Sequence, residues 1–297
     1  MMNRVTLTED LSLSRLVYGM WRIGDDPDTS PAHVQAKVEA CLAQDITTMD
    51  QADIYGGYTA EGILGDALRA APGLRDRIEI VTKCDIVAPM GKYSDAACKH
   101  YDTSGDHIRT SVENSLRDMG TDRIDLLLIH RPDPLMDPDD TGAALDGLIA
   151  SGKVRAVGVS NFRPWDVDLL QGSMQAPLVT NQIEISLAAT APFTNGDLAF
   201  HQRRRDVVMG WSPLGGGRLM TDQGPLGQAL DAMAQVFGVD RSAVAVAFLL
   251  RHPARILPVL GTNSLARIAR IADAGRVDLS RVQWFQLYQA ALGQEVP

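Results

Sequence analysis

The feature that most constrains this chain is a regular alternation of short apolar runs with longer amphipathic stretches. Eight runs have the length and composition of buried strands. They cover residues 13–21, 46–52, 78–83, 124–130, 154–161, 178–185, 207–214 and 256–262. Strands separated by helices pair in parallel, which defines the α/β class. Eight such units in 297 residues favour a closed (β/α)8 TIM barrel, although counting leaves an open doubly wound sheet as the alternative.

Helical patterns fill the intervals between these strands. They are expected at residues 33–44, 59–70, 106–119, 141–151, 164–173, 196–204, 226–237 and 264–274. Outside the repeat, residues 3–12 predict an N-terminal β-hairpin, while residues 240–251 and the segment WFQLYQAAL predict extra helices. Because no linker or composition break interrupts the chain, residues 1–297 are expected to form a single domain.

Composition and charge narrow the classes of function. A hydrophobic content of 45% is enough for a large core. The formal net charge of −9, without a dense basic stripe, argues against nucleic acid and against an anionic membrane surface as partners. The three cysteines have no metal-ligand spacing, so neither a disulfide framework nor a metal site is expected. We expect a soluble, cytoplasmic protein that does not bind membranes and is a monomer.

Four residues that can hold or move protons lie at or just after the ends of three neighbouring strands: Asp50, Tyr55, Lys83 and His130. Singly, each has a structural explanation, such as a helix cap for Asp50 or a snorkelling side chain for Lys83. In a barrel, however, the carboxyl ends of the strands meet at one face. A lysine held by a carboxylate would lower the pKa of the Tyr55 phenol, which could then donate a proton to a carbonyl oxygen positioned by His130.

Such a reduction needs electrons from a cofactor, yet the chain has no Rossmann or Walker fingerprint. The run Gly215, Gly216, Gly217 matches neither pattern, and a flexible turn is its structural alternative. Trp211 precedes this run and offers a flat platform on the same rim.

Polar groups on other strands complete this interpretation. Ser160, Asn161 and Gln182 offer hydroxyl and amide groups suited to the carboxamide of a nicotinamide ring. Arg267 opens the last helix of the repeat beside Thr262, where a guanidinium and backbone N–H groups predict an anion site.

Together these residues resemble the aldo-keto reductase family, and the resemblance covers nearly the whole chain. It rests on MDQADIYGGYTAEGILGDAL, the lysine of VTKC, SVENSLRDMGTDRIDLLLIHRPDP, SGKVRAVGVSNF, NQIEIS, WSPLGGGRL and LGTNSLARI, in the family's order. It looks closest to a bacterial oxidoreductase branch with a tryptophan in the WSPLGGG segment. The resemblance implies a (β/α)8 barrel and an NADPH-dependent carbonyl reductase with the catalytic residues Asp50, Tyr55, Lys83 and His130.

The resemblance also implies the positions that would bind cofactor and substrate. The cofactor positions are Gly19, Met20, Ser160, Asn161, Gln182, Trp211, Ser212, Pro213, Leu214, Gly216, Arg218, Gly261, Thr262, Asn263, Arg267 and Arg270. The substrate, a small carbonyl compound, is expected beside the long loop 85–105, in contact with Trp21, Tyr55, His130 and Phe162.

The residues at the adenosine end depart from the family pattern. Gly261 and Thr262 stand where many relatives have a lysine and a serine or threonine for the 2′-phosphate. Arg267 keeps the usual arginine, so NADPH is expected over NADH, and Arg270 is a candidate replacement for the lysine.

Two other classes of function fit part of the pattern. A related branch of the family serves as channel-associated subunits, so one alternative is a cofactor-binding regulatory or interaction protein with little turnover. A lyase or hydrolase on the same barrel is the other, and it is weakened because the sequence supplies neither metal ligands nor a separate nucleophile. The sequence leaves the particular substrate open.

Overall fold

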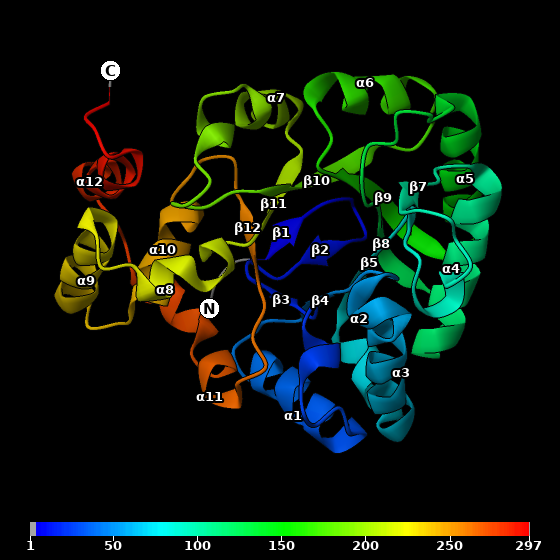
Figure 1. Cartoon of the computed structure of the whole chain (residues 1–297), viewed down its shortest axis with the longest axis horizontal. Coiled ribbons are helices and arrows are strands. Elements are labelled where there is room, and N and C mark those ends of the chain that lie inside the picture. The colour runs from blue at the N-terminus through cyan, green and yellow to red at the C-terminus, as the bar shows by residue number, and fades with distance from the viewer. Residues whose placement is uncertain (1–3, 297) are drawn as a thin grey trace.

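The computed structural model describes residues 4–296 and contains a closed barrel of parallel strands (Figure 1). Around the barrel the order is β10, β11, β12, β3, β4, β5, β8, β9. Their bounds are Val17–Gly19 (β3), Thr48–Asp50 (β4), Glu79–Cys84 (β5), Ile124–Ile129 (β8), Val154–Ser160 (β9), Leu178–Glu184 (β10), Val207–Trp211 (β11) and Leu257–Leu260 (β12). Each predicted apolar run supplies one strand, and the expected (β/α)8 TIM barrel is confirmed.

Helices surround the barrel (Figure 1). They are Pro31–Leu42 (α1), Tyr55–Tyr58 (α2), Ala60–Ala70 (α3), Gly105–Met119 (α4), Pro138–Ala150 (α5), Pro164–Gly172 (α6), Asp197–Arg204 (α7), Arg218–Thr221 (α8), Pro225–Phe237 (α9), Arg241–Leu250 (α10), Leu265–Ile268 (α11) and Arg281–Leu292 (α12). Within residues 4–296 no single helix is long and apolar enough to cross a membrane. The pair α9 and α10 reaches that length and composition only together, bent by 91°.

The strands bury both of their faces, in two separate apolar layers. In β8, Leu126 and Leu128 belong to one cluster while Leu127 and Ile129 belong to the other, as the period of two in a strand requires. The first cluster fills the barrel interior, and the second lies between the strands and the helices. All of β8 is buried, which explains why its sequence is apolar except for Asp125, a buried carboxylate paired with Arg75.

A hairpin covers the amino-terminal end of the barrel. Its strands, Val5–Thr6 (β1) and Ser12–Leu13 (β2), are antiparallel, and Val5, Leu11 and Leu13 join the interior cluster. The predicted hairpin is confirmed for the described residues; residue 3, where the prediction began, lies outside them. Because Leu13 belongs to the hairpin, the first barrel strand is shorter than the predicted run 13–21.

The structure differs from the sequence prediction in three other places. The helix predicted over 264–274 is split into α11 and a 3₁₀ turn, Ile271–Arg276. The main contacts of α9 are with α8, α10 and α12, whereas α10 packs against β12, so α9 and not α10 is the extra element. The long loop 85–105 contains a small antiparallel pair, Ile86–Val87 (β6) and His100–Tyr101 (β7).

Candidate active site

The four side chains predicted as a proton-donating unit meet at the carboxyl ends of β4, β5 and β8. Lys83 Nζ lies 2.8 Å from Asp50 Oδ2 and 3.1 Å from the Tyr55 hydroxyl. It also donates to the Gln51 carbonyl at 2.7 Å. The His130 ring meets the Tyr55 ring edge-on, with centroids 5.9 Å apart. The structure thus brings these four residues into one preformed cluster.

Strand register and a glycine turn place these groups. Asp50 ends β4 and is paired with Val81 of β5. Lys83 comes two residues after Val81, so its side chain lies on the same face of β5. Tyr55 begins α2, in which Gly56 and Gly57 have φ values of 61° and 65°. Residues with a Cβ rarely adopt such φ values, so glycine suits this tight turn. The turn holds the Tyr55 ring with its centroid 4.9 Å from Lys83 Nζ.

The electrostatics combine a neutral phenol with a charged lysine. Burial raises the pKa of Tyr55 above its ordinary value, although Lys83 opposes the rise. Burial alone would lower the pKa of Lys83, but Asp50 and Tyr55 raise it above the ordinary value, so the amine stays charged. The lowered phenol pKa expected from the sequence is therefore wrong. Desolvation of a buried phenol outweighs the attraction of one neighbouring ammonium.

His130 is neutral in this setting. Burial, with Lys83 and Arg131 nearby, lowers the pKa of His130 well below its usual value. Its Nδ1 has no hydrogen-bond partner within residues 4–296, and its backbone N–H donates to the Cys84 carbonyl at 3.0 Å. A neutral imidazole can donate or accept a hydrogen bond without adding charge to the site.

The residues predicted to hold a carboxamide lie beside this cluster and are bonded to one another. Gln182 Nε2 donates to Asp50 Oδ1 at 2.7 Å, and Ser160 Oγ donates to the Gln182 carbonyl at 2.8 Å. Trp211 Nε1 donates to Asn161 Oδ1 at 3.0 Å. The link between Gln182 and Asp50 was missed by the sequence reasoning, because it joins residues 132 positions apart.

The glycine run after β11 forms an open cradle. Gly215, Gly216 and Gly217 all have positive φ. A Cβ at Gly216 or Gly217 would meet no atom within 4 Å, so the backbone there is accessible. The other predicted positions in this segment, Ser212, Pro213, Leu214 and Arg218, flank the run, and Arg218 Nε donates to the Gly215 carbonyl at 3.1 Å. Left-handed backbone of this kind can approach a pyrophosphate closely.

The loop after β12 is anchored by buried groups. The Tyr18 hydroxyl donates to the Thr262 carbonyl at 2.9 Å. Asn263 Nδ2 donates to the Arg22 carbonyl at 2.7 Å, and Asn263 Oδ1 accepts from Lys37 Nζ at 3.3 Å. These bonds fix the path of the chain into α11, at the predicted phosphate site.

The two arginines predicted at this end are in different settings. Arg267, in α11, is exposed. Arg270 forms ion pairs with Asp273 at 3.3 Å and Asp240 at 3.5 Å. A phosphate would have to compete with Asp240 and Asp273 for Arg270. Neither of these two carboxylates is paired with Arg267.

The two predicted positions at the end of the first barrel strand are part of the core. The backbone of Gly19 lies close to that of Gly261, since a Cβ on Gly261 would be 3.2 Å from the Gly19 carbonyl oxygen. Met20 is 1% exposed, with its sulfur 3.3 Å from Gln51 Nε2. The Met20 side chain therefore packs inside the protein.

Sequence reasoning missed one buried cation, Lys37. Its side chain is 0% exposed and pairs with Asp26 as well as Asn263. Lys37 lies on the buried face of α1 together with Val34, Val38 and Cys41. A lysine at a core-facing helical position was the available signal, because such a charge needs a partner.

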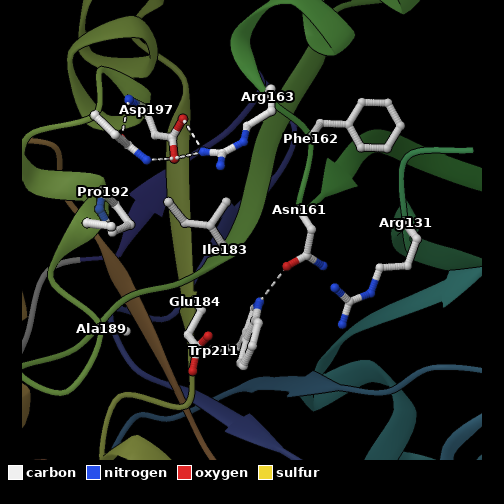
Figure 2. Close-up of a pocket in the computed structure, with 12 residues that line it drawn as sticks. Arg131, Asn161, Phe162, Arg163, Ile183, Glu184, Ala189, Pro192, Asp197 and Trp211 are labelled. Atoms are coloured by element: carbon white, nitrogen blue, oxygen red, sulfur yellow. Dashed lines mark hydrogen bonds and ion pairs between the residues drawn. The ribbon is translucent and has the colours of Figure 1, made fainter. Parts of the chain in front are cut away.

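A cavity of about 380 Å³ opens between the ends of β9, β10 and β11 (Figure 2). None of the four clustered side chains lines it; the nearest lining residue in sequence is Arg131, which follows His130. Its lining includes Arg131, Asn161, Glu184 and Trp211. Figure 2 shows the Phe162 ring pointing away from the other labelled side chains, and Phe162 is only 1% exposed. The expected substrate contact by that ring is therefore corrected: Phe162 borders the cavity, but its ring packs in the core.

Two other elements border the reactive face. Trp21 is 57% exposed and stacks with the Arg22 guanidinium at 5.0 Å. The loop 85–105 is tied to the turn that carries Tyr55, because the Tyr58 hydroxyl donates to the Ile86 carbonyl at 3.0 Å and accepts from the Ala88 N–H at 2.9 Å.

Known proteins share this architecture. An aldo/keto reductase from Klebsiella pneumoniae, solved in complex with NADP and acetate, superposes with a TM-score of 0.81 at 25% identity, covering 97% of this chain and 94% of its own. A 6-dehydroglucose reductase from Agrobacterium fabrum is 67% identical over 99% of this chain and 100% of its own length. Another 6-dehydroglucose reductase, from Novosphingobium aromaticivorans, is 39% identical over 97% and 94%.

The family assignment follows from the extent of these matches. The model of the "Aldo/keto reductase family" matches residues 15–291, from two residues before the first barrel strand into the last helix. The strand ends that carry Asp50, Lys83 and His130 all lie within that span. This chain belongs to the aldo/keto reductase family.

Proposed function

We propose that this protein reduces the aldehyde carbon of an oxidised hexose, of the 6-dehydroglucose type, to an alcohol, with NADPH as the reductant. Membership of the family supports NAD(P)H-dependent carbonyl reduction. The two relatives named as 6-dehydroglucose reductases, at 67% and 39% identity, support the sugar aldehyde as substrate. The Klebsiella relative in complex with NADP supports the cofactor.

The observation that carries the chemistry is the position of Lys83 Nζ, between the Asp50 carboxylate at 2.8 Å and the Tyr55 hydroxyl at 3.1 Å. Tyr55 keeps its proton at neutral pH and so has a proton to give, but its raised pKa makes it a weaker acid, which the charged Lys83 has to offset. As the carbonyl oxygen gains negative charge, Tyr55 transfers that proton to it. The charged Lys83 then stabilises the phenolate that remains, and Asp50 keeps the lysine charged and in place.

His130 has an orienting part in this mechanism. A neutral imidazole next to the phenol can hydrogen-bond the carbonyl oxygen and direct it towards the Tyr55 hydroxyl. Were the imidazole charged, it would compete with Tyr55 as the proton donor. The fall in the pKa of His130 therefore supports the phenol as the proton donor.

The residues present fit a dinucleotide. Trp211 offers a ring for stacking, the polar groups of Ser160, Asn161 and Gln182 lie on the adjoining strands, and the left-handed glycines after β11 leave room for a pyrophosphate. A reduced nicotinamide, when bound there, supplies a hydride for the carbonyl carbon. The exposed Arg267 suits the 2′-phosphate that distinguishes NADPH from NADH.

The lining of the cavity suits a polyhydroxylated substrate. Arg131 and Glu184 place a guanidinium and a carboxylate around one opening. Guanidinium groups donate and carboxylates accept hydrogen bonds, so the pair can bind hydroxyl groups of a sugar in fixed positions. A purely aliphatic aldehyde would leave both groups without partners.

The test is consumption of NADPH and NADH with a hexose 6-aldehyde, glucose, glyceraldehyde and butanal, with the product identified by NMR. We expect the highest kcat/KM for the hexose 6-aldehyde, conversion of its C6 aldehyde to an alcohol, and faster turnover with NADPH. A higher kcat/KM for butanal would contradict the sugar substrate. Tight NADPH binding without turnover of any of these compounds would favour a regulatory protein instead.

A further inference from the structure

Asp85 has a backbone conformation that L-amino acids rarely adopt. It follows β5 directly, two residues after Lys83, and its φ is 107°. Glycine reaches this region freely, whereas a residue with a Cβ is strained there. Strained residues persist where surrounding contacts hold them, and they cluster at functional sites.

The contacts of Asp85 lead to the catalytic histidine. Its Oδ2 accepts a hydrogen bond from the backbone N–H of Arg131 at 2.9 Å. In the same place the His130 N–H donates to the carbonyl of Cys84, the residue before Asp85, at 3.0 Å. Two adjacent peptide groups of the His130 segment are thus tied to two adjacent residues at the end of β5.

The backbone of Asp85 also holds the returning arm of loop 85–105. Its carbonyl accepts a hydrogen bond from the Asp102 N–H at 2.8 Å, next to the small sheet formed by β6 and β7. A single residue therefore connects the strand of Lys83, the peptide that carries His130 and the returning arm of loop 85–105.

The burial of this carboxyl group is costly for the fold. Asp85 is 0% exposed, and its Oδ1 has no hydrogen-bond partner within the described part of the chain. Burial raises the pKa of Asp85 well above its usual value, and the nearby Asp53 adds to the rise. A strained backbone and a half-satisfied buried carboxyl group both oppose stability, so stability alone does not explain this residue.

We propose that Asp85 is a positioning residue, whose carboxyl group fixes the peptide between His130 and Arg131 so that the imidazole of His130 faces the hydroxyl of Tyr55. The inference rests on the proposed function, because positioning of His130 affects turnover only if His130 orients the substrate. Its physical basis is geometric: displacing a group that orients the substrate by about 1 Å can cost on the order of a hundredfold in rate.

Two substitutions separate positioning from stability. Asp85→Gly relieves the strained φ but removes the acceptor of the Arg131 N–H. Asp85→Asn keeps an oxygen acceptor, and asparagine tolerates positive φ better than most residues. The matched control is Asp45→Gly, which relieves a φ of 61° at an exposed residue before β4, at the opposite end of the barrel.

For Asp85→Gly we expect unchanged or raised Tm, unchanged NADPH Kd by tryptophan fluorescence, faster hydrogen exchange at the Arg131 amide, and a fall in kcat of about tenfold to a hundredfold. Asp85→Asn should recover kcat to within about threefold of the wild type, the size of effect left when one hydrogen bond is kept but weakened. Asp45→Gly should raise Tm and leave kcat unchanged.

Other outcomes would overturn the proposal. Wild-type kcat in Asp85→Gly would mean that the contact does not orient His130. Loss of folding or of NADPH binding in that variant would make Asp85 a structural residue. Hydrogen exchange and Tm can be measured without turnover, which separates the two proposals. An inactive wild-type protein would refute the proposed function. Exchange at the Arg131 amide as slow in Asp85→Gly as in the wild type would refute the positioning contact.

Discussion

The proposed catalytic cluster and the phosphate end of the proposed cofactor site are built in opposite ways. Asp50 and Lys83 are 2% and 0% exposed and are bonded to each other. Arg267 and Arg270, by contrast, are exposed, on or next to a helix of four residues. Both regions contain buried charge, since Lys37 is buried behind the phosphate end, but the arginines that would contact the phosphate remain in water.

This difference follows from what each region has to do. Charges that act on reacting atoms are most effective when they are desolvated and fixed before the substrate arrives, because Coulomb interactions strengthen in a medium of low dielectric. Charges that hold a phosphate contribute binding, which a hydrated arginine can supply without a buried partner. We therefore expect substitutions in the first region to change turnover and substitutions in the second to change cofactor affinity.

The largest effect is expected from Tyr55→Phe. The substitution keeps the ring but removes the proton, so kcat should fall by about a thousandfold, the usual range for a general acid. The affinity for NADPH should stay within about twofold of the wild-type value, because the residues proposed to bind the cofactor are unchanged. Single-turnover oxidation of NADPH and fluorescence titration would measure the two quantities. Retention of most activity would show that another group donates the proton.

Asp50→Asn should give the next largest effect. It leaves the Lys83 ammonium buried without its carboxylate, so the lysine would lose charge and the phenolate its stabilising partner. We expect kcat to fall by about a hundredfold, with the NADPH Kd nearly unchanged. A variant that binds NADPH poorly but turns over normally at saturation would erase the contrast between the two regions.

Arg267→Ala tests the phosphate end. Loss of a charge-assisted hydrogen bond should weaken NADPH binding by about tenfold and leave both NADH binding and kcat at saturation unchanged. Arg270→Ala is the matched control, because Arg270 is already paired with Asp240 and Asp273, and it should weaken NADPH binding by less than about threefold. Equal weakening of NADPH and NADH, or a larger effect at Arg270, would disprove the assignment.

The smallest effect on turnover is expected at Asp53, three residues after Asp50. It is 2% exposed, and neither of its carboxylate oxygens has a hydrogen-bond partner in the part of the chain described. Burial, and to a smaller extent the negative charge of Glu61, raises the pKa of Asp53 to about 8. The unfolded chain loses this proton near the ordinary pKa of 3.8, while the folded protein keeps it up to about pH 8. The contribution of Asp53 to wild-type stability should therefore fall as pH rises through this window and level off above it.

Asp53→Asn should remove that dependence. Its gain in the free energy of unfolding over the wild type should grow between about pH 4 and pH 8 by at most about 1.4 kcal/mol per pH unit. Urea unfolding at pH 5, 6.5 and 8 would measure the difference. A gain that does not change with pH would mean that Asp53 is ionised in the folded protein throughout this range.

The sequence alone predicted the barrel, because its information is local. The runs that became β5 and β8 carry apolar residues on both faces, and their lengths match strands. The positions of Lys83 and His130 at strand ends were enough to place them on one face, since parallel strands in a barrel end together. The cytoplasmic location, the monomeric state and the single-domain organisation stay predictions.

Only the tertiary structure decided the contacts and the degree of desolvation. The bond from Gln182 to Asp50, the pairing of Lys37 with Asn263 and the inward packing of Phe162 join or bury residues that no local pattern connects. The pKa of Tyr55 depends on how completely the packed protein excludes water, and burial reversed the direction that a pairwise argument predicted. The sequence determined which groups meet, by their order and period, whereas the complete packing around them determined their charge and orientation.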